Sequence, residues 1–328
     1  MNNTFSRQLG RSGIQVSAMG LGCWAIGGPF TSPGNVPVGW SAVDDGESIR
    51  AIHRALELGV NFFDTSDVYG AGHSEEVLGK ALAGRRDGVV IATKFGNVFD
   101  SPTRHVTGED GSPEHARQAL EASLRRLNTD YIDLYQFHLS GYPPEKAAPT
   151  RDALEQLVEE GKIRGYAWST DSLERVKVFA EGPHCIAVQQ HMNVFSYNAE
   201  ILALCEERNL ASVNRSPLAM GLLTGKFQES TRFPADDVRR NVEWYEGIKG
   251  GKPNPAWLRK LDAIRQILTS EGRTLAQGAL AWIWARSENT IPIPGFKTVK
   301  QAEENINAMQ FGPLSKEQMH QIDILLVQ

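Results

Sequence analysis

One unit recurs along this chain: a short apolar run rich in β-branched residues, a polar loop, and then a stretch with helical periodicity. Continuous apolar runs are typical of strands that are buried on both faces of a parallel sheet. Eight such runs occur, at residues 17–22, 60–64, 89–94, 132–138, 163–169, 186–190, 211–216 and 290–294. Eight strand-then-helix units favour an α/β fold of the closed (β/α)8 type, the TIM barrel, over an open doubly wound sheet.

Capping residues and apolar stripes indicate the helices between these strands. Ser112 followed by Pro113 is a favourable helix start, and Thr274 with Gln277 forms a capping-box pattern. Gly161 is placed to end another helix. Apolar stripes predict eight helices, around residues 49–56, 77–82, 116–127, 153–158, 173–179, 201–204, 257–264 and 275–283.

The two ends of the chain lie outside this repeat. Residues 5–17 (FSRQLGRSGIQVS) predict a β-hairpin that plugs the bottom of the barrel. Residues 298–309, and the segment that begins with the Ser315 to Gln318 capping-box pattern, predict two extra C-terminal helices. Residues 1–328 are therefore expected to form one barrel domain.

Composition excludes several classes of protein. Lys and Arg number 34 against 39 Asp and Glu, so the basic excess of a nucleic-acid-binding protein is missing. Three cysteines without a Cys-x-x-Cys pair argue against a disulfide framework and a zinc ribbon, and no cluster has metal-ligand spacing, so we expect no metal. No signal peptide is visible, and the Gly and Pro of the charge-free stretch before Asp44 are incompatible with a spanning helix. We expect a cytoplasmic protein that contacts neither nucleic acid nor membrane.

Three connections are too long for simple turns, at residues 27–44, 97–111 and 227–254. They follow strands one, three and seven, so we expect structureless binding loops on one rim of the barrel. Their aromatic and cationic residues are candidates for substrate contact: Phe30, Trp40, Phe99, Phe233, Trp244, Tyr245, Arg104, His105, Arg232, Arg239 and Arg240.

The residues that end the strands predict where chemistry occurs, because the active site of such a barrel lies at the carboxyl ends of its strands. Asp64, Lys94 and His138 end three strands, and Tyr69 follows Asp64 in the loop TSDVYG. A buried Lys94 needs a charge partner, which Asp64 can supply. The lysine should also lower the pKa of Tyr69 and make it a general acid, while His138 orients a carbonyl oxygen.

A structural interpretation competes with this one. A single polar residue at a strand end is more often structural than catalytic, and an Asp–Lys pair can be a structural ion pair. Four such residues on one rim favour a catalytic site.

The chain resembles the aldo-keto reductases, specifically the bacterial-type NADP-dependent members. The resemblance is carried by GLGCWAIGG, NFFDTSDVYGAGHSEEVLGKAL, IATK, LNTDYIDLYQFH, GKIRGYAWST, SPLAMGLLTGKF and IPGFKTVKQAEEN, which occur in the family's order. It implies that Asp64, Tyr69, Lys94 and His138 are the catalytic tetrad, with Tyr69 as the proton donor. It also implies a substrate pocket at Trp24, Tyr69 and His138.

The same resemblance implies NADPH, held across the barrel rim without a Rossmann domain, and no Gly-x-Gly-x-x-Gly follows the first strand. Ser169 and Gln189 match residues that hold the nicotinamide carboxamide. The helix that begins near Thr298 should offer free N–H groups to phosphate. The implied cofactor residues are Cys23, Trp24, Asp64, Ser169, Thr170, Gln189, Arg215, Ser216, Pro217, Leu218, Ala219, Gly221, Leu222, Lys226, Gly295, Phe296, Lys297, Gln301, Glu304 and Asn305.

Three positions depart from the family's pattern. Thr170 stands where many relatives carry Asn, and Arg215 stands where many carry an aromatic ring that stacks on the nicotinamide. Gln301 replaces an Arg that grips the 2′-phosphate in some members. Lys297 and Lys300 can substitute for that charge, so NADPH is favoured over NADH.

We therefore expect reversible reduction of an aldehyde or ketone, sugars and other polar carbonyls among them. The alternative is a cofactor-binding regulatory subunit with little turnover, as in the potassium channel beta subunits that resemble these reductases. A Schiff-base aldolase that uses Lys94 is a third hypothesis, which the TSDVYG context disfavours. The sequence does not predict the oligomeric state.

Overall fold

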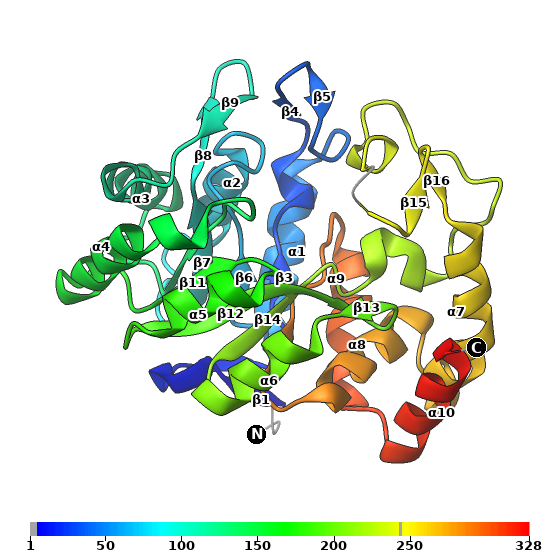
Figure 1. The fold of residues 1–328 in the computed structure, drawn as a ribbon. Helices are drawn as coiled ribbons and strands as arrows, with labels where there is room; N and C mark the ends of the chain where they lie inside the picture. Colours follow the sequence, from blue (N-terminus) through cyan, green and yellow to red (C-terminus); the bar gives the residue numbers. More distant parts are fainter. Residues whose placement is uncertain (1–4, 243–244, 328) are drawn as a thin grey trace.

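The computed structural model describes residues 5–242 and 245–327, and its centre is a barrel of parallel strands (Figure 1). The strands run in the order β3 (Leu21–Gly22), β6 (Phe62–Asp64), β7 (Val90–Phe95), β10 (Leu134–Phe137), β11 (Tyr166–Ser169), β12 (Cys185–Asn193), β14 (Ala211–Arg215) and β17 (Thr290–Pro292). The first and last strands meet where Gly22 pairs with Gly295 and the Gly20 N–H donates to the Pro292 carbonyl at 3.0 Å. The predicted TIM barrel is therefore confirmed.

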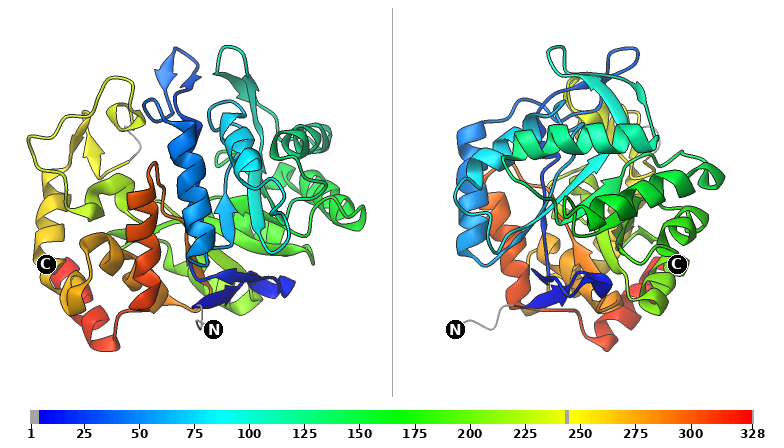
Figure 2. Two further views of the ribbon diagram at one scale, coloured as in Figure 1. Left: turned by 180° about the vertical axis from the view of Figure 1, so that it is seen from behind. Right: turned by 90° about the vertical axis from the view of Figure 1, so that its left-hand side faces the viewer.

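Ten α-helices within the described residues accompany the strands (Figure 2). They are α1 (Asp45–Glu57), α2 (His73–Ala81), α3 (Pro113–Leu127), α4 (Ala148–Glu159), α5 (Leu173–Ala180), α6 (Ala199–Arg208), α7 (Pro255–Leu268), α8 (Leu275–Arg286), α9 (Val299–Ile306) and α10 (Lys316–Val327). The predicted caps are present: the Ser112 hydroxyl accepts the His115 N–H, and Thr274 and Gln277 form a reciprocal capping box. Ser315 and Gln318 do the same ahead of α10.

The order of the helices differs from the prediction in one respect. Both α7 and α8 lie between β14 and β17, so the chain places two helices in one connection. Helix α9, expected outside the repeat, packs instead against α1 and α8 and closes the ring (Figure 2). The helices outside the ring are α7 and α10, which pack on each other.

The bottom of the barrel is closed by the N-terminal hairpin, as predicted. Its strands β1 (Ser6–Gln8) and β2 (Gln15–Ser17) pair antiparallel at the base of the molecule (Figure 1). Leu9 and Val16 join the apolar cluster inside the barrel, which also holds Phe62 and Ala187. Arg11 fixes the hairpin from outside by donating to the carbonyls of Cys185 and Gly182 at 2.8 and 2.6 Å.

Gly10, between the two hairpin strands, gives the first testable prediction. Its φ is +55°, and a Cβ built on it would lie 2.0 Å from the Ile186 carbonyl oxygen. Replacing Gly10 by Ala should therefore lower the free energy of unfolding by about 2 kcal/mol or more, because the hairpin must move off the barrel. Urea unfolding measures this loss. Gly13→Ala is the matched control, because Gly13 also has a positive φ (+76°) but its Cβ would meet nothing within 4 Å. Equal losses in the two variants would contradict the steric explanation.

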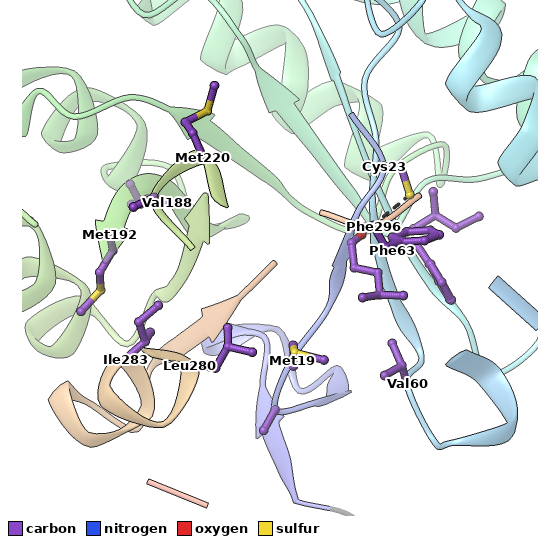
Figure 3. Close-up of a cluster of buried hydrophobic side chains, with 14 of the residues drawn as sticks. Met19, Cys23, Val60, Phe63, Val188, Met192, Met220, Leu280, Ile283 and Phe296 are labelled. Carbon is purple, nitrogen blue, oxygen red and sulfur yellow. Dashed lines mark hydrogen bonds between the residues drawn. The ribbon is translucent and has the colours of Figure 1, made fainter. Parts of the chain in front are cut away.

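A second apolar cluster lies between the barrel and its helices. Figure 3 shows Val188 and Met192 of β12 beside Leu280 and Ile283 of α8. All four side chains are almost fully buried. Since burial of a Leu or Ile side chain contributes about 2 kcal/mol, this layer holds α8 on the barrel.

The three long connections lie on one rim, as predicted, but they are not structureless. The first contains β4 (Thr31–Ser32) and β5 (Val36–Pro37), and the second contains β8 (Asn97–Asp100) and β9 (His105–Glu109). Pairing of Thr31 with His105 joins them into one small sheet above the barrel (Figure 1). The third contains the short strands β15 (Ile248–Lys249) and β16 (Lys252–Pro253), and its Val238 N–H donates to the Gly39 carbonyl at 2.9 Å.

Arg239 adds a further link between the first and third connections. Its guanidinium lies 4.7 Å from the ring centre of Trp40 and 4.5 Å from that of Phe233. Asp237 accepts two hydrogen bonds from the same guanidinium, at 2.8 and 2.6 Å. None of the helices described here is long and apolar enough to cross a membrane.

Candidate active site

The inner face of the barrel changes from apolar to polar at the carboxyl ends of its strands. Alternate residues of a strand face the interior, so the positions above Phe62, Ala92 and Leu134 point into the barrel mouth. Those upper positions are Asp64, Lys94, Gln136, His138, Ser169, Gln189 and Arg215. The alternation therefore brings six of the predicted site residues together, and with them Gln136, which was not predicted.

Lys94 and Asp64 form a fully buried ion pair, as the sequence predicted. The Lys94 Nζ lies 2.6 Å from Asp64 Oδ1 and also donates to the Thr65 carbonyl at 2.7 Å. The other carboxylate oxygen, Oδ2, accepts from the side-chain amides of Gln136 and Gln189, both at 2.8 Å. Burial lowers the pKa of Lys94, but Asp64 and Tyr69 raise it more, so the lysine stays charged.

Tyr69 reaches back over this pair from the turn that follows β6. The turn is held by the Tyr69 N–H, which donates to the Ser66 carbonyl at 3.2 Å. The Tyr69 hydroxyl accepts a hydrogen bond from Lys94 Nζ at 3.3 Å. The ring stacks on Trp24, with 6.0 Å between ring centres, and Trp24 meets Trp40 edge-on at 5.6 Å. Trp24 and Tyr69 therefore line the same side of the barrel mouth.

The expected lowering of the Tyr69 pKa is wrong. Burial raises the pKa of the phenol above its ordinary value, and the nearby Lys94 offsets this effect only in part, with Asp64 acting in the raising direction. The hydroxyl is therefore protonated at neutral pH. It is held in the form that can give a proton to an oxygen that is gaining negative charge.

His138 completes the group from the end of β10. Its ring meets that of Tyr69 edge-on, with 6.0 Å between ring centres, and its Nδ1 lies 3.3 Å from the Ser66 hydroxyl. Burial, followed by the positive charges of Lys94 and Arg215, lowers the pKa of His138 well below its ordinary value. The imidazole is therefore neutral, and it can act as a hydrogen-bond donor without adding charge to the site.

A charged lysine, a paired carboxylate and two neutral donors thus converge at one barrel mouth. The family model of the aldo/keto reductase family matches residues 18–327. The chain belongs to the aldo/keto reductase family. It is 34% identical over 307 residues to the NADP(+) aldo-keto reductase yakc of Schizosaccharomyces pombe, with 90% of this chain and 84% of that protein covered.

Solved structures of other family members share the fold. A glycerol dehydrogenase of Gluconobacter oxydans superposes with a TM-score of 0.82 at 31% identity, covering 99% of this chain and 96% of that one. An aldo/keto reductase of Klebsiella pneumoniae in complex with NADP and acetate gives a TM-score of 0.71 at 27% identity, covering 98% and 95%. The chain is thus similar to oxidoreductases over nearly its whole length.

The residues that the resemblance assigns to a carboxamide lie together in this aldo/keto reductase. Ser169 donates to the Gln189 Oε1 at 3.5 Å at the top of β11 and β12. Thr170, which replaces Asn, uses its hydroxyl to accept the Ser172 N–H at 3.2 Å, so it supports the turn. Arg215 is paired with the Asp171 carboxylate, a partner that the sequence did not predict.

Several of the assigned residues face elsewhere or are already engaged. Cys23 and Phe296 both pack with Phe63 in the second apolar cluster (Figure 3), so neither side chain faces the barrel mouth. Burial, with Asp64 nearby, raises the pKa of the Cys23 thiol far above its usual range, which makes it unreactive. The side-chain oxygen Oε1 of Gln301 accepts a hydrogen bond from the Lys297 N–H at 2.8 Å.

The segment 216–226 forms an irregular loop after β14. Ser216, Ala219 and Met220 all have φ values between +51° and +55°, and Gly221 has +94°. Pro217, Leu218 and Leu222 occupy the same loop, which ends at Lys226. The Ala219 and Gly221 N–H groups donate to the Ser216 and Leu218 carbonyls, both at 2.9 Å, so these backbone donors are used within the loop itself.

The start of α9 offers fewer free N–H groups than the sequence led us to expect, because two of them are already engaged. The Val299 N–H donates to Glu47 Oε1 at 2.9 Å, and the Gln301 N–H donates to the Thr298 hydroxyl at 3.3 Å. The physical reason is that capping by Thr298 and the approach of α1 satisfy these groups within the protein. In the same region the Asn305 side-chain amide donates a hydrogen bond to the Gly295 carbonyl. The Gln277 side-chain amide donates to the Glu304 carbonyl.

Several loop residues expected to meet substrate are occupied elsewhere. Phe30, Phe233 and Tyr245 are buried within the connections, and Arg239 is committed to Asp237. Trp244 lies outside the described residues. Within residues 5–242 and 245–327, no group of three His, Cys or carboxylate side chains could hold a metal ion.

The buried ionisable groups beside the site predict how stability depends on pH. His138 and His191 have lowered pKa values, that of His191 falling to about 4 through burial and the charge of Arg215. Asp67 has a raised pKa of about 8, because it is buried and Glu75 is near, although Arg126 opposes the shift. Between about pH 5 and 6 the unfolded chain binds nearly two more protons at the histidines, and the native state binds one more at Asp67.

These three groups alone lower the free energy of unfolding by about 1.4 kcal/mol per pH unit as the pH drops below 6.5, and His115, whose pKa burial also lowers, adds to the loss. From pH 7 to 8 Asp67 makes the largest difference between the two states, so stability should fall by about 1 kcal/mol as the pH rises over this range. Urea unfolding from pH 4.5 to 8 should thus show a maximum near pH 6.5. Asp67→Asn should remove the decline above pH 7, and a decline that persists in that variant would contradict this assignment.

Proposed function

We propose that this protein is an NADPH-dependent carbonyl reductase that converts an aldehyde or ketone reversibly to an alcohol, with Tyr69 as the proton donor. The observation that carries the proposal is the protonated Tyr69 hydroxyl, 3.3 Å from a buried Lys94 that is itself paired with Asp64. A regulatory role remains the alternative, and it is separated from this proposal by turnover.

Each residue of the tetrad has a role that its environment supports. When bound, the dihydronicotinamide would supply the hydride that the carbonyl carbon accepts. Tyr69 gives its proton to the carbonyl oxygen as negative charge develops there. The positive charge of Lys94 stabilises the phenolate that remains, and Asp64 keeps that lysine in place. Neutral His138 donates to the same oxygen and orients it.

The charge distribution around the barrel mouth fits a phosphate-bearing cofactor. Burial lowers the pKa of both Lys226 and Lys297, and the Arg239 charge acts on each in the same direction, so these three cations lie near one another. Asp237 lies among them, yet both of its oxygens are already taken by Arg239. The cofactor named for the yeast relative and the Klebsiella structure supports NADP(H).

The proposal is tested by fluorescence titration with NADPH and NADH, followed by absorbance of the reduced nicotinamide in the presence of aldehydes, ketones and sugars. We expect tighter binding of NADPH and oxidation that depends on the carbonyl compound. Tight binding without oxidation by any carbonyl would favour the regulatory alternative. Absence of binding would remove the basis for both.

A further inference from the structure

Gln136 has no place in the predicted tetrad, yet it lies at the centre of the buried polar network beneath it. Its side chain is fully buried on the inner face of β10, two residues before His138. Its Nε2 donates to Asp64 Oδ2 at 2.8 Å, and its Oε1 accepts from Gln189 Nε2 at 3.0 Å. Gln189 Nε2 also donates to Asp64 Oδ2 at 2.8 Å.

These contacts determine which way each amide is turned. An ionised carboxylate only accepts hydrogen bonds, so both glutamines must present their NH2 groups to Asp64. The side-chain oxygen of Gln136 is then free to accept a hydrogen bond, and it accepts one from the second N–H of the Gln189 amide. With both of its N–H groups used inside the barrel, Gln189 can offer only its Oε1 to the mouth, where Ser169 lies 3.5 Å away.

We propose that Gln136 is a positioning residue that fixes the Gln189 amide so that it presents an acceptor, which selects a carboxamide NH2 on the nicotinamide. This inference rests on the proposed function, because it assumes that a nicotinamide binds beside Gln189. Gln136 touches neither cofactor nor substrate in this arrangement. It acts through Gln189, and by the same contacts it keeps the Asp64 carboxylate aligned with Lys94.

Gln190 is a control that distinguishes this positioning role from a general need of the fold for a buried, hydrogen-bonded amide. Gln190 follows Gln189 in β12 and is equally buried, but it faces outward, where its Nε2 donates to the Ser212 hydroxyl at 2.8 Å. Loss of either amide removes one buried hydrogen-bonding group from the barrel wall. Only the loss of Gln136 removes one of the two hydrogen bonds that hold the Gln189 NH2 group inside the barrel.

The test compares the dissociation constants of two reduced cofactors, NADPH and its 3-acetylpyridine analogue, in which a methyl group replaces the carboxamide NH2. The wild-type protein should bind NADPH about 3- to 10-fold more tightly, the range that one lost hydrogen bond gives. Gln136→Leu should reduce that ratio toward one, because Gln189 keeps only its bond to Asp64. Gln190→Leu should leave the ratio at the wild-type value. Gln136→Met, which keeps the length of the side chain, replaces Gln136→Leu if the latter does not fold.

The outcomes are distinct. An unchanged ratio in the Gln136 variants, or equal binding of both cofactors by the wild-type protein, would overturn the inference and leave carbonyl reduction standing. A ratio that falls equally in Gln190→Leu would assign the effect to general loosening of the barrel and also overturn it. If the wild-type protein bound neither reduced cofactor, the proposed function itself would fail.

Discussion

Tyr69→Phe should lower kcat for carbonyl reduction by about 1,000-fold, the mid-range loss for a positioned general acid. The phenol is the group that combines a proton with access to the barrel mouth, and its raised pKa keeps that proton in place at neutral pH. Removal of the hydroxyl leaves the Lys94–Asp64 pair and its amide donors intact. The dissociation constant for NADPH should therefore stay within about two-fold of the wild-type value, a change of less than 0.5 kcal/mol.

The matched control is Tyr135→Phe, which removes a hydroxyl from an equally buried tyrosine. Tyr135 faces outward from β10 and donates to the Ala116 carbonyl at 3.0 Å, so it has no contact with the tetrad. Its loss should cost about 1 kcal/mol of stability and leave kcat nearly unchanged. Near-normal turnover in Tyr69→Phe would remove Tyr69 from the role of proton donor. A comparable loss in both variants would indicate an effect of folding.

The barrel could be predicted from the sequence because its signals are local. An apolar strand followed by a capped amphipathic helix is encoded within about 30 residues, and the Ser112 and Thr274 caps appear in the structure as predicted. The place of α9 could not be predicted in this way. Its helical pattern is as clear as that of α7, and only packing against α1, some 250 residues away, places it in the ring.

The connections on the rim of the barrel likewise could not be predicted from local sequence signals. The pairing of Thr31 with His105 and the stacking of Arg239 on Trp40 join segments that are distant in sequence and carry no periodic pattern. Loops therefore appeared structureless, and residues such as Phe233 appeared available to substrate although they are buried. Short strands of two residues give too little alternation for a sequence-based prediction.

Within the candidate site, residue types were predictable and their environments were not. Asp64, Lys94 and His138 could be identified because charged or polar residues end apolar strands. Gln136 was missed although the signal existed, since it shares the inner face with His138 at a spacing of two residues. The direction of the Tyr69 pKa was wrong because the contribution of burial depends on packing by Trp24 and the loops, which the sequence does not show.

Lys94→Met should abolish most turnover and also destabilise the fold, because it leaves the Asp64 carboxylate buried without a cation. Breaking a buried ion pair by removing one partner costs about 3–5 kcal/mol. Gln136 and Gln189 still donate to Asp64 Oδ2, so a value near the lower end is expected. Urea unfolding measures the loss of stability, and carbonyl-dependent oxidation of NADPH measures the loss of turnover.

The double variant Asp64→Asn with Lys94→Met separates the structural and catalytic interpretations of this pair. Once both charges are gone, no unpaired ion is buried, so most of the lost stability should return. Turnover should remain at the level of Lys94→Met, because a neutral side chain at position 94 cannot stabilise the Tyr69 phenolate. Asp64→Asn alone should give a milder loss of turnover, since the lysine charge is retained. Recovery of turnover together with stability in the double variant would mean that Lys94 and Asp64 serve the fold alone, and that Tyr69 does not depend on their charge.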